Sequence, residues 1–179
     1  MKTNNHEVIF TIVNSGYAEE AMLGFYKAAV EELVGSGVMR GYAAYVGNDI
    51  LAYCNCGAKE KYKVLPLPEE ERAIPTAPEG SKILAIAELL ISHNFQNCGL
   101  EEKLLEFVLT NAKRQGYTHV EAYPIEDCLP ELYDARLAIY EKMGFAVIRD
   151  LSGGHFLHNE WDREGEKPYR RLYILQKEL

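Results

Sequence analysis

The sequence predicts an α/β domain in which helices flank a mixed β-sheet, and three observations support this class. Short β-branched or apolar runs alternate with amphipathic stretches along the whole chain, in the order β-α-β-β-β-α-β-α-β-β. The 179 residues suffice for one sizeable core, so we expect a single domain spanning residues 1–179. Neither an internal repeat nor a low-complexity tract interrupts the pattern.

The first part of the chain predicts a strand, a helix and a hairpin. Residues 7–13 form a β-branched run and predict the first strand. Between residues 18 and 33, apolar side chains recur at helical spacing, and a Gly-Ser-Gly triplet follows as a stop signal. Two strand-like runs, 42–46 and 50–56, flank a Gly-Asn-Asp triplet that favours a hairpin turn.

The second part begins with a segment rich in proline and charge, residues 57–81. Neither flank is complete as a domain of its own, so we interpret this segment as a long excursion over the surface and not as a linker. Further strands and helices follow it. They are predicted as a strand at 83–91, a turn at 92–99, a helix from about Leu100, a strand at 118–123, a helix at 132–143 that ends before Gly144, and strands at 145–148 and 172–175.

The composition excludes some classes of partner. A net charge of −8 argues against a nucleic-acid-binding surface, because neutralising phosphates requires clustered Lys and Arg. The same charge is compatible with a cationic small substrate such as an amine, although solubility alone also explains it. No run approaches the ~20 apolar residues that a membrane span needs. Residues 1–7 lack the apolar region of a signal peptide, so we expect a cytoplasmic location and no membrane association.

The four cysteines are too few and too scattered for a disulfide scaffold. Cys54 and Cys56 alternate along a predicted strand and therefore face the same side. Zinc binding by this pair together with His155 and His158 is an open alternative, but the spacing is not that of a standard zinc site. Buried thiols that pack as small hydrophobic groups are the favoured interpretation, and we expect no metal.

The most informative segment runs from the apolar strand 83–91 through a short turn into an amphipathic helix. This layout directs the first, unpaired backbone N–H groups of the helix at whatever occupies the turn. Together with the helix dipole, these donors form an anion site that suits phosphate. The turn therefore suggests that the chain binds a phosphorylated ligand.

Two motifs sharpen this suggestion: residues 96–101 (QNCGLE) and residues 139–145 (IYEKMGF), with a strand-like run at 120–124 between them. Together they resemble the GNAT superfamily of acyl-CoA-dependent N-acetyltransferases. The pyrophosphate loop of that family is Q/R-x-x-G-x-G/A, and its later signature is L-Y-E-K-x-G-F. The resemblance covers roughly residues 83–148. It implies a mixed, splayed central sheet whose fourth and fifth strands part to admit the pantetheine arm of acetyl-CoA.

The resemblance also implies which residues bind acetyl-CoA, the expected cosubstrate. A strand that parts from its neighbour can pair with an extended ligand through its backbone, and the residues at this position are Leu89, Leu90 and Ile91. The loop and the start of the helix are expected to hold the pyrophosphate, and a tyrosine before the last helix is expected to touch the cosubstrate. By position these residues are Gln96, Asn97, Cys98, Gly99, Leu100, Glu101 and Tyr133.

Glu101 departs from the family pattern, which has Gly or Ala at this position. A carboxylate in the first helical turn suits the helix dipole, but it repels a neighbouring pyrophosphate. A side chain that points outward into solvent is harmless, and both outcomes are open from the sequence. The neutral Asn97 and Cys98 also stand where family members often carry an extra Arg or Lys.

Tyr140 matches the family tyrosine that often donates a proton to the departing sulfur of coenzyme A. A phenol suits this step because it is protonated at neutral pH and donates a hydrogen bond without carrying charge. The alternative is an ordinary aromatic residue on the inner face of its helix, packed with Leu137 and Phe145.

Glu88 lies inside an otherwise apolar strand, where burial raises the pKa of a carboxyl group and prepares a general base. Members of the GNAT superfamily often place a base on this strand. The alternative is an outward-facing position, which strand alternation also allows. Glu121 on the next strand is a second candidate for the base, although a solvated strand residue is the favoured interpretation of it.

These observations predict an enzyme that transfers an acetyl group from acetyl-CoA to a primary amine by direct attack, without a metal. The acidic composition favours a small-molecule amine as the acceptor. The alternative is a degenerate acetyltransferase fold that serves as a binding or sensor module, and Glu101 motivates it. Dimers are common in proteins of this kind, so a homodimer is also compatible with the sequence.

Overall fold

The computed structural model describes residues 8–13, 39–47, 49–62, 65, 67, 69–126, 137–151 and 171–179. The strands are β1 (Ile9–Val13), β2 (Met39–Val46), β3 (Asp49–Ala58), β4 (Ile83–Ile91), β5 (His119–Ala122), β6 (Ile125–Glu126), β7 (Ala146–Asp150) and β8 (Arg171–Glu178). The helices are α3 (Glu69–Arg72), the short 3-10 helix η1 (His93–Phe95), α4 (Leu100–Arg114) and α5 (Leu137–Lys142). No helix within these ranges is long and apolar enough to span a bilayer.

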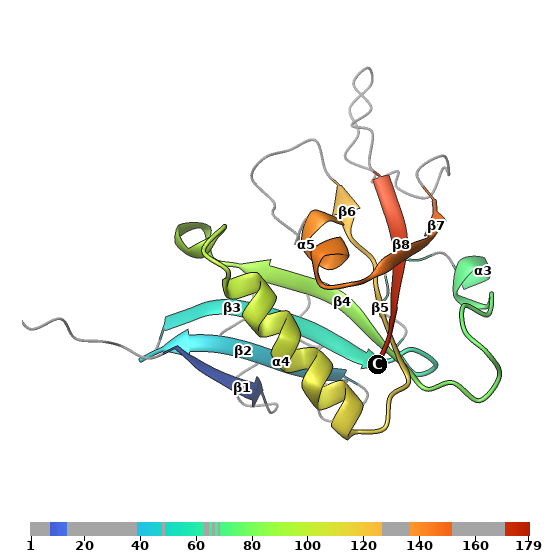
Figure 1. Cartoon of the computed structure of the whole chain (residues 1–179), viewed down its shortest axis with the longest axis horizontal. Coiled ribbons are helices and arrows are strands. Elements are labelled where there is room, and N and C mark those ends of the chain that lie inside the picture. Colours follow the sequence, from blue (N-terminus) through green and yellow to red (C-terminus); the bar gives the residue numbers. More distant parts are fainter. Residues whose placement is uncertain are drawn as a thin grey trace, which may run out of the picture.

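The strands follow the order β1-β2-β3-β4-β5-β8-β6 across a mixed sheet, and β7 also pairs with β8. Strands β1 to β4 are antiparallel neighbours, whereas β4 and β5 are parallel. Parallel neighbours need a long crossover connection, and here α4 provides it. In Figure 1, α4 lies across β2, β3 and β4 on one face of the sheet.

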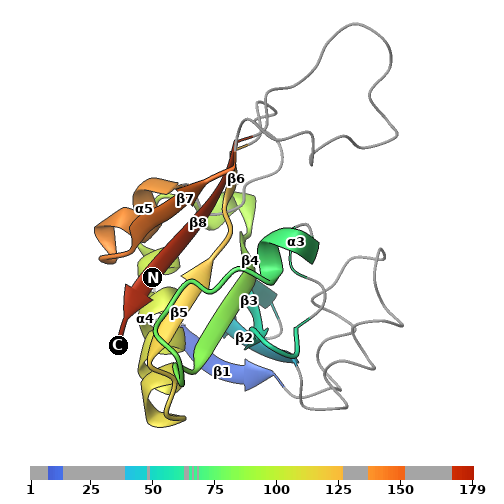
Figure 2. The ribbon, with the colours of Figure 1, turned by 90° about the vertical axis from the view of Figure 1, so that its right-hand side faces the viewer.

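Apolar side chains form a core on each face of the sheet. The first core lies beneath α4, whose buried residues recur at helical spacing and pack on inward-facing residues of β2, β3 and β4. The second core covers the opposite face, and Figure 2 shows α3 and α4 on opposite sides of β4. The buried residues that α4 contributes are Leu100, Leu104, Leu105, Val108, Leu109 and Ala112.

Most predicted elements are confirmed where the structure describes them. The two strands predicted at 42–46 and 50–56 form the β2–β3 hairpin, and the strand, turn and helix from residue 83 onward are β4, η1 and α4. Gly144 follows α5 with a φ of 83°, a left-handed conformation that favours glycine at the end of a helix. The predicted helix at 18–33 and the first part of the predicted helix at 132–143 lie outside the described residues.

The segment at 57–81 is not simply a surface excursion. It covers the second face of the sheet, where Tyr62, Leu65 and Leu67 are buried against residues of β4 and β8. These three apolar residues are scattered among prolines and charges, so they carry no periodic signal in the sequence. Their burial depends on contacts with distant strands.

Candidate functional site

The outer half of β4 (residues 87–91) parts from β5. β4 pairs with β5 only as far as Ile86, whereas its ladder with β3 continues to the end of the strand. The strand is also bulged at Ala87, because Asn55 of β3 is opposite Glu88 while the next residue of β3 is opposite Ile86. In the part of the chain that the structure describes, the outer half therefore has a strand neighbour on one edge only. This is the splay that the sequence predicts.

The backbone of Leu89 and Ile91 faces the edge that β5 leaves. The Ser92 N–H donates to the carbonyl of Leu51 at 2.8 Å, so this position belongs to the hydrogen-bonded series of the β3–β4 ladder. In an antiparallel ladder, residues that hydrogen-bond to the neighbouring strand alternate with residues that do not. Leu90, like Ser92, therefore bonds to β3, whereas Leu89 and Ile91 do not. The backbone N–H and C=O groups of Leu89 and Ile91 point away from β3, toward the edge where an extended ligand can add as a strand.

Residues 92–99 form a tight loop that leads into α4. Asn97 and Gly99 both adopt left-handed conformations, with φ of 59° and 79°, and asparagine and glycine are the residues that tolerate them best. Gly99 is the N-cap of α4 and provides no side-chain cap for the first N–H groups of the helix. The thiol of the exposed Cys98 donates to the carbonyl of Phe95, with 2.7 Å between sulfur and oxygen. Gln96 is half-buried at the base of the loop.

Glu101 is buried, with 4% of its surface exposed, so the alternative in which it points outward into solvent is wrong. Its Oε1 atom accepts the backbone N–H of Asn97 at 3.0 Å. Its Oε2 atom is buried, and no described residue forms a hydrogen bond with it. Glu101 therefore places its own negative charge against a donor of the loop that is predicted to bind a phosphate.

The helix α5 lies against the start of α4. Lys142 Nζ is 2.8 Å from Glu102 Oε1, and this hydrogen bond lowers the pKa of Glu102 and raises the pKa of Lys142. Tyr140 precedes Lys142 by two residues, about half a helical turn, and so lies on a different side of α5. It is buried and meets Phe145 edge to face, with ring centroids 5.3 Å apart. The packing alternative for Tyr140 is thus confirmed, and its role as a proton donor stays a prediction.

Glu88 lies on the face of the sheet opposite α4, directly across from Asn55. It is half-buried on a strand inside the sheet, not at an edge. Burial raises the pKa of Glu88, and hydrogen bonding from the Asn55 side chain offsets part of this rise. A carboxyl group with a raised pKa has the property that a general base needs near neutral pH.

Glu121 is fully buried, so the solvated position predicted for it is wrong. Lys59 Nζ lies 2.8 Å from its Oε2 atom, and the Tyr123 hydroxyl donates to the same oxygen at 2.7 Å. The Oε1 atom accepts hydrogen bonds from Thr76 and Gln176. The prediction failed because Lys59 and Thr76 come from the segment that was expected to lie on the surface. Both oxygens of Glu121 therefore have partners within the fold.

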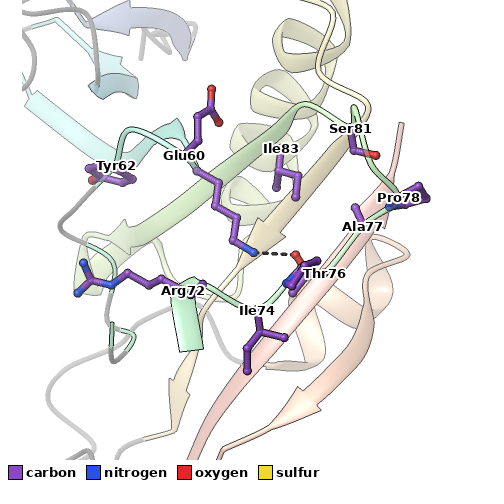
Figure 3. Close-up of a pocket in the computed structure, with 12 residues that line it drawn as sticks. Glu60, Tyr62, Arg72, Ile74, Thr76, Ala77, Pro78, Ser81 and Ile83 are labelled. Atoms are coloured by element: carbon purple, nitrogen blue, oxygen red, sulfur yellow. Dashed lines mark hydrogen bonds between the residues drawn. The ribbon is translucent and has the colours of Figure 1, made fainter. Parts of the chain in front are cut away.

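A cavity of about 700 Å³ lies between this same segment and the start of β4. Figure 3 shows Ile83 of β4 and Thr76 of the preceding segment among its lining residues. The Lys59 ammonium in the cavity donates to Thr76 at 2.6 Å and is already paired with Glu121. The cavity is at the end of β4 remote from the loop at 92–99, so we do not assign the acceptor to it.

Several predicted site residues are buried in the core or lie outside the described residues. Leu100 is buried in the core beneath α4, so only its backbone can serve the loop. Cys54 and Cys56 are buried in the same core, which confirms the packing interpretation. Among the residues that the structure describes, no three His, Cys, Asp or Glu side chains are grouped as metal ligands. The predicted Tyr133, and the histidines of the zinc alternative, His155 and His158, lie outside the described residues.

Comparison with solved structures shows that the chain has the fold of the GNAT acetyltransferases. Arabidopsis thaliana NAA60 in complex with a bisubstrate analogue has a TM-score of 0.65 and 15% identity, covering 96% of this chain and 98% of that chain. An IAA acetyltransferase from Bacillus cereus ATCC 14579 has a TM-score of 0.62 and 16% identity, covering 97% and 100%. A GNAT family acetyltransferase from Elizabethkingia anophelis with acetyl-CoA bound has a TM-score of 0.60 and 16% identity, covering 99% and 100%. No protein-family model matches the sequence, and no curated protein matches it.

The described residues fit an acyl-CoA under one condition. The splayed edge of β4 offers backbone groups to an extended arm, and the uncapped start of α4 offers donors to a pyrophosphate. Glu101 must release the Asn97 N–H before a phosphate can take that donor.

The sequence analysis missed one residue of the site, Asn55, which lies beside Glu88. Strand alternation places Asn55 on the face opposite Cys54 and Cys56, so the sequence did contain a signal for it.

Proposed function

We propose that the protein is an N-acetyltransferase that transfers an acetyl group from acetyl-CoA to a primary amine of a small molecule by direct attack. One observation carries this proposal: the outer half of β4 has left β5 and leads straight into the loop at the start of α4. The two features together suit a ligand with an extended arm and a pyrophosphate, which is the form of coenzyme A.

Each step of the reaction has a residue suited to it. Glu88 accepts the proton of the acceptor ammonium, which leaves a neutral amine able to attack the thioester carbon. Backbone N–H groups on the edge of β4 that β5 leaves, that of Ile91 among them, hold the thioester oxygen while the C–N bond forms. As the C–S bond breaks, Tyr140 gives its proton to the sulfur. The attacking nitrogen loses its second proton to solvent, solvent returns a proton to the Tyr140 phenolate, and the products are the acetylated amine and the thiol.

The proposed acceptor is a small amine and not a protein. The net charge of −8 favours a cationic acceptor. Among structural neighbours, NatC was solved bound to Gag peptide and CoA, so the fold also accommodates proteins that bind peptides. A panel containing primary alkylamines, polyamines and short peptides with free N-termini distinguishes the two classes, and we expect acetylation of the amines.

A second candidate function is a binding or sensor module without catalysis. The observation that favours it is the buried Glu101 carboxylate, which occupies a donor of the phosphate loop. Such a module is expected to bind acetyl-CoA weakly or not at all and to acetylate no amine.

The test is mass-spectrometric detection of acetylated product after incubation with acetyl-CoA and the panel. The proposed function predicts a product with wild type and strongly reduced product with Glu88→Ala and Tyr140→Phe. Full activity of both variants on an identified acceptor contradicts the proposed residue roles. No product from any amine, in a folded sample, supports the binding module.

A further inference from the structure

A polar row crosses three strands on the face of the sheet opposite α4. Asn55 of β3 is paired with Gly41 of β2 on one side and with Glu88 of β4 on the other. Successive residues of a strand point to opposite faces, and Cys54 and Cys56 lie in the core beneath α4. Asn55 therefore points to the other face, in line with Glu88 and beside the outer half of β4.

Asn55 is buried, but its hydrogen bonds are incomplete. It is 4% exposed, its side-chain amide interacts with the Glu88 carboxylate, and its carbonyl oxygen Oδ1 has no hydrogen-bond partner among the described residues. Folded proteins leave few buried polar atoms unpaired, so each one calls for an explanation. At this position, next to Glu88, a ligand that brings its own N–H donor would pair with Asn55 Oδ1.

Tyr53 supplies a second unpaired atom to the same row. It is 3% exposed, and its hydroxyl also has no hydrogen-bond partner in the part of the chain that the structure describes. A Cβ atom added to Gly41 would lie 2.6 Å from this hydroxyl, so the Tyr53 ring lies directly over Gly41, the cross-strand partner of Asn55. The hydroxyl therefore lies on the Gly41 side of Asn55, and Glu88 lies on the other side.

We propose that Asn55 and Tyr53 form the binding subsite for the ammonium group of the acceptor, and that Asn55 also positions Glu88. The proposal deepens the proposed function and rests on it, because it assigns the amine to the Glu88 side of β4. An ammonium carries only donors, and the row offers acceptors along its length: the Glu88 carboxylate, then Asn55 Oδ1, then the Tyr53 hydroxyl. Glu88 then takes one proton, and the amine nitrogen becomes free to attack.

This subsite selects primary amines for a physical reason. Buried acceptors that go unpaired are unfavourable, so a ligand without N–H donors is penalised against one that supplies them. A quaternary ammonium has the same charge but no N–H group. The proposal therefore predicts discrimination between two cations of equal charge.

The first experiment measures the coupling of Asn55 to Glu88 without any cosubstrate. Carbon-13 NMR of the side-chain carboxyl group, assigned with Glu88→Gln, reports the titration of Glu88. Asn55→Leu should raise the pKa of Glu88, because it removes a hydrogen bond that lowers it. Tyr53 and Tyr62 also face Glu88, but burial raises the pKa of both, so neither titrates in this range. Asn111→Leu on α4 is the matched control, and an unchanged Glu88 pKa in Asn55→Leu overturns the positioning role.

The second experiment measures binding of butylammonium by NMR, with tetramethylammonium as the matched cation. We expect butylammonium to bind wild type, to bind Asn55→Leu about tenfold more weakly, and to bind better than tetramethylammonium. Tyr53→Phe keeps the ring over Gly41, removes only the hydroxyl, and should weaken binding about threefold even if Asn55→Leu does not fold. Equal binding of the two cations, unchanged binding in both variants, or no binding of butylammonium overturns the subsite. Failure to bind acetyl-CoA instead contradicts the proposed function and leaves these results unaffected.

Discussion

The two halves of β4 differ in how their polar groups are satisfied. The inner half, Ile83 to Ile86, is paired on both edges, and the carboxylate beside it on β5, Glu121, accepts hydrogen bonds or an ion pair from Lys59, Thr76, Tyr123 and Gln176. The outer half begins with a bulge and is paired with β3 on one edge in the described chain.

The same contrast holds for the two strand carboxylates. Glu121 is fully buried and its donors stabilise the charge, whereas Glu88 is half-buried, has Asn55 as its neighbour, and has a raised pKa. The comparison teaches that burial alone does not mark a reactive carboxyl group. Glu88 differs from Glu121 in two ways: Asn55 is the hydrogen-bond donor that lowers its pKa, and it lies on the part of β4 that does not pair with β5.

The largest expected effect is on catalysis at the outer half. Glu88→Gln should lower acetyl transfer by about 10²–10⁴-fold, because the amide cannot accept the proton of the ammonium. Steady-state kinetics on an identified amine gives this value, and the KM for acetyl-CoA should change little. If Glu121→Gln lowers the rate as much while its fold is intact, the contrast between the two carboxylates is wrong.

The next largest effect is on stability at the inner half. Glu121→Gln should lower the free energy of unfolding by about 2–4 kcal/mol, because it leaves the largely buried Lys59 ammonium without its counter-charge and removes the acceptor of several buried hydrogen bonds. Urea denaturation measures the loss. The exposed Glu178→Gln on β8 is the control, and it should change stability by less than about 0.5 kcal/mol. A loss below about 1 kcal/mol for Glu121→Gln contradicts the structural role.

Tyr140→Phe separates packing from proton donation. The ring and its contact with Phe145 are retained, so the variant should stay folded, while turnover should fall by about 10²-fold. Tyr117→Phe, at the margin of the same core, is the control and should keep its activity. Full turnover of Tyr140→Phe leaves Tyr140 with a packing role alone.

Glu101→Ala sharpens the account of the loop. Removing the carboxylate frees the Asn97 N–H and removes a like charge from the phosphate position, so acetyl-CoA should bind about tenfold more tightly. The exposed Glu106→Ala on α4 is the control for charge alone. Equal affinities of Glu101→Ala and wild type place the pyrophosphate away from Glu101.

The smallest effect concerns stability and pH. The pKa of Glu88 in the folded protein is above its ordinary value of 4.5, so the favourable contribution of this group is complete below about pH 4.5 and is lost as the pH rises through the folded pKa. Glu88→Gln should therefore match wild type in stability at low pH and exceed it at pH 7. Thermal unfolding across this range checks the sign, and a variant that is less stable at pH 7 contradicts it.

Local signals in the sequence predicted the elements that position the site. The apolar run of β4, the Gly-Asn-Asp triplet of the hairpin and the helical spacing of α4 are short-range features, and the splay followed from resemblance to a family. Side-chain environments were harder to predict. The burial of Glu121 depends on Lys59 and Thr76 from a distant segment, and the orientation of Glu101 depends on the left-handed turn at Asn97. Such contacts leave no periodic signal.

The measurement that tests the central claim most directly is calorimetric titration of the wild-type protein with acetyl-CoA. We expect saturable binding in the micromolar range, since the edge of β4 that β5 leaves runs directly into the loop at the start of α4. Tighter binding by Glu101→Ala in the same assay locates the pyrophosphate at the loop. No heat of binding from wild type or from Glu101→Ala, in folded and monodisperse samples, contradicts the claim that this site holds an acyl-CoA.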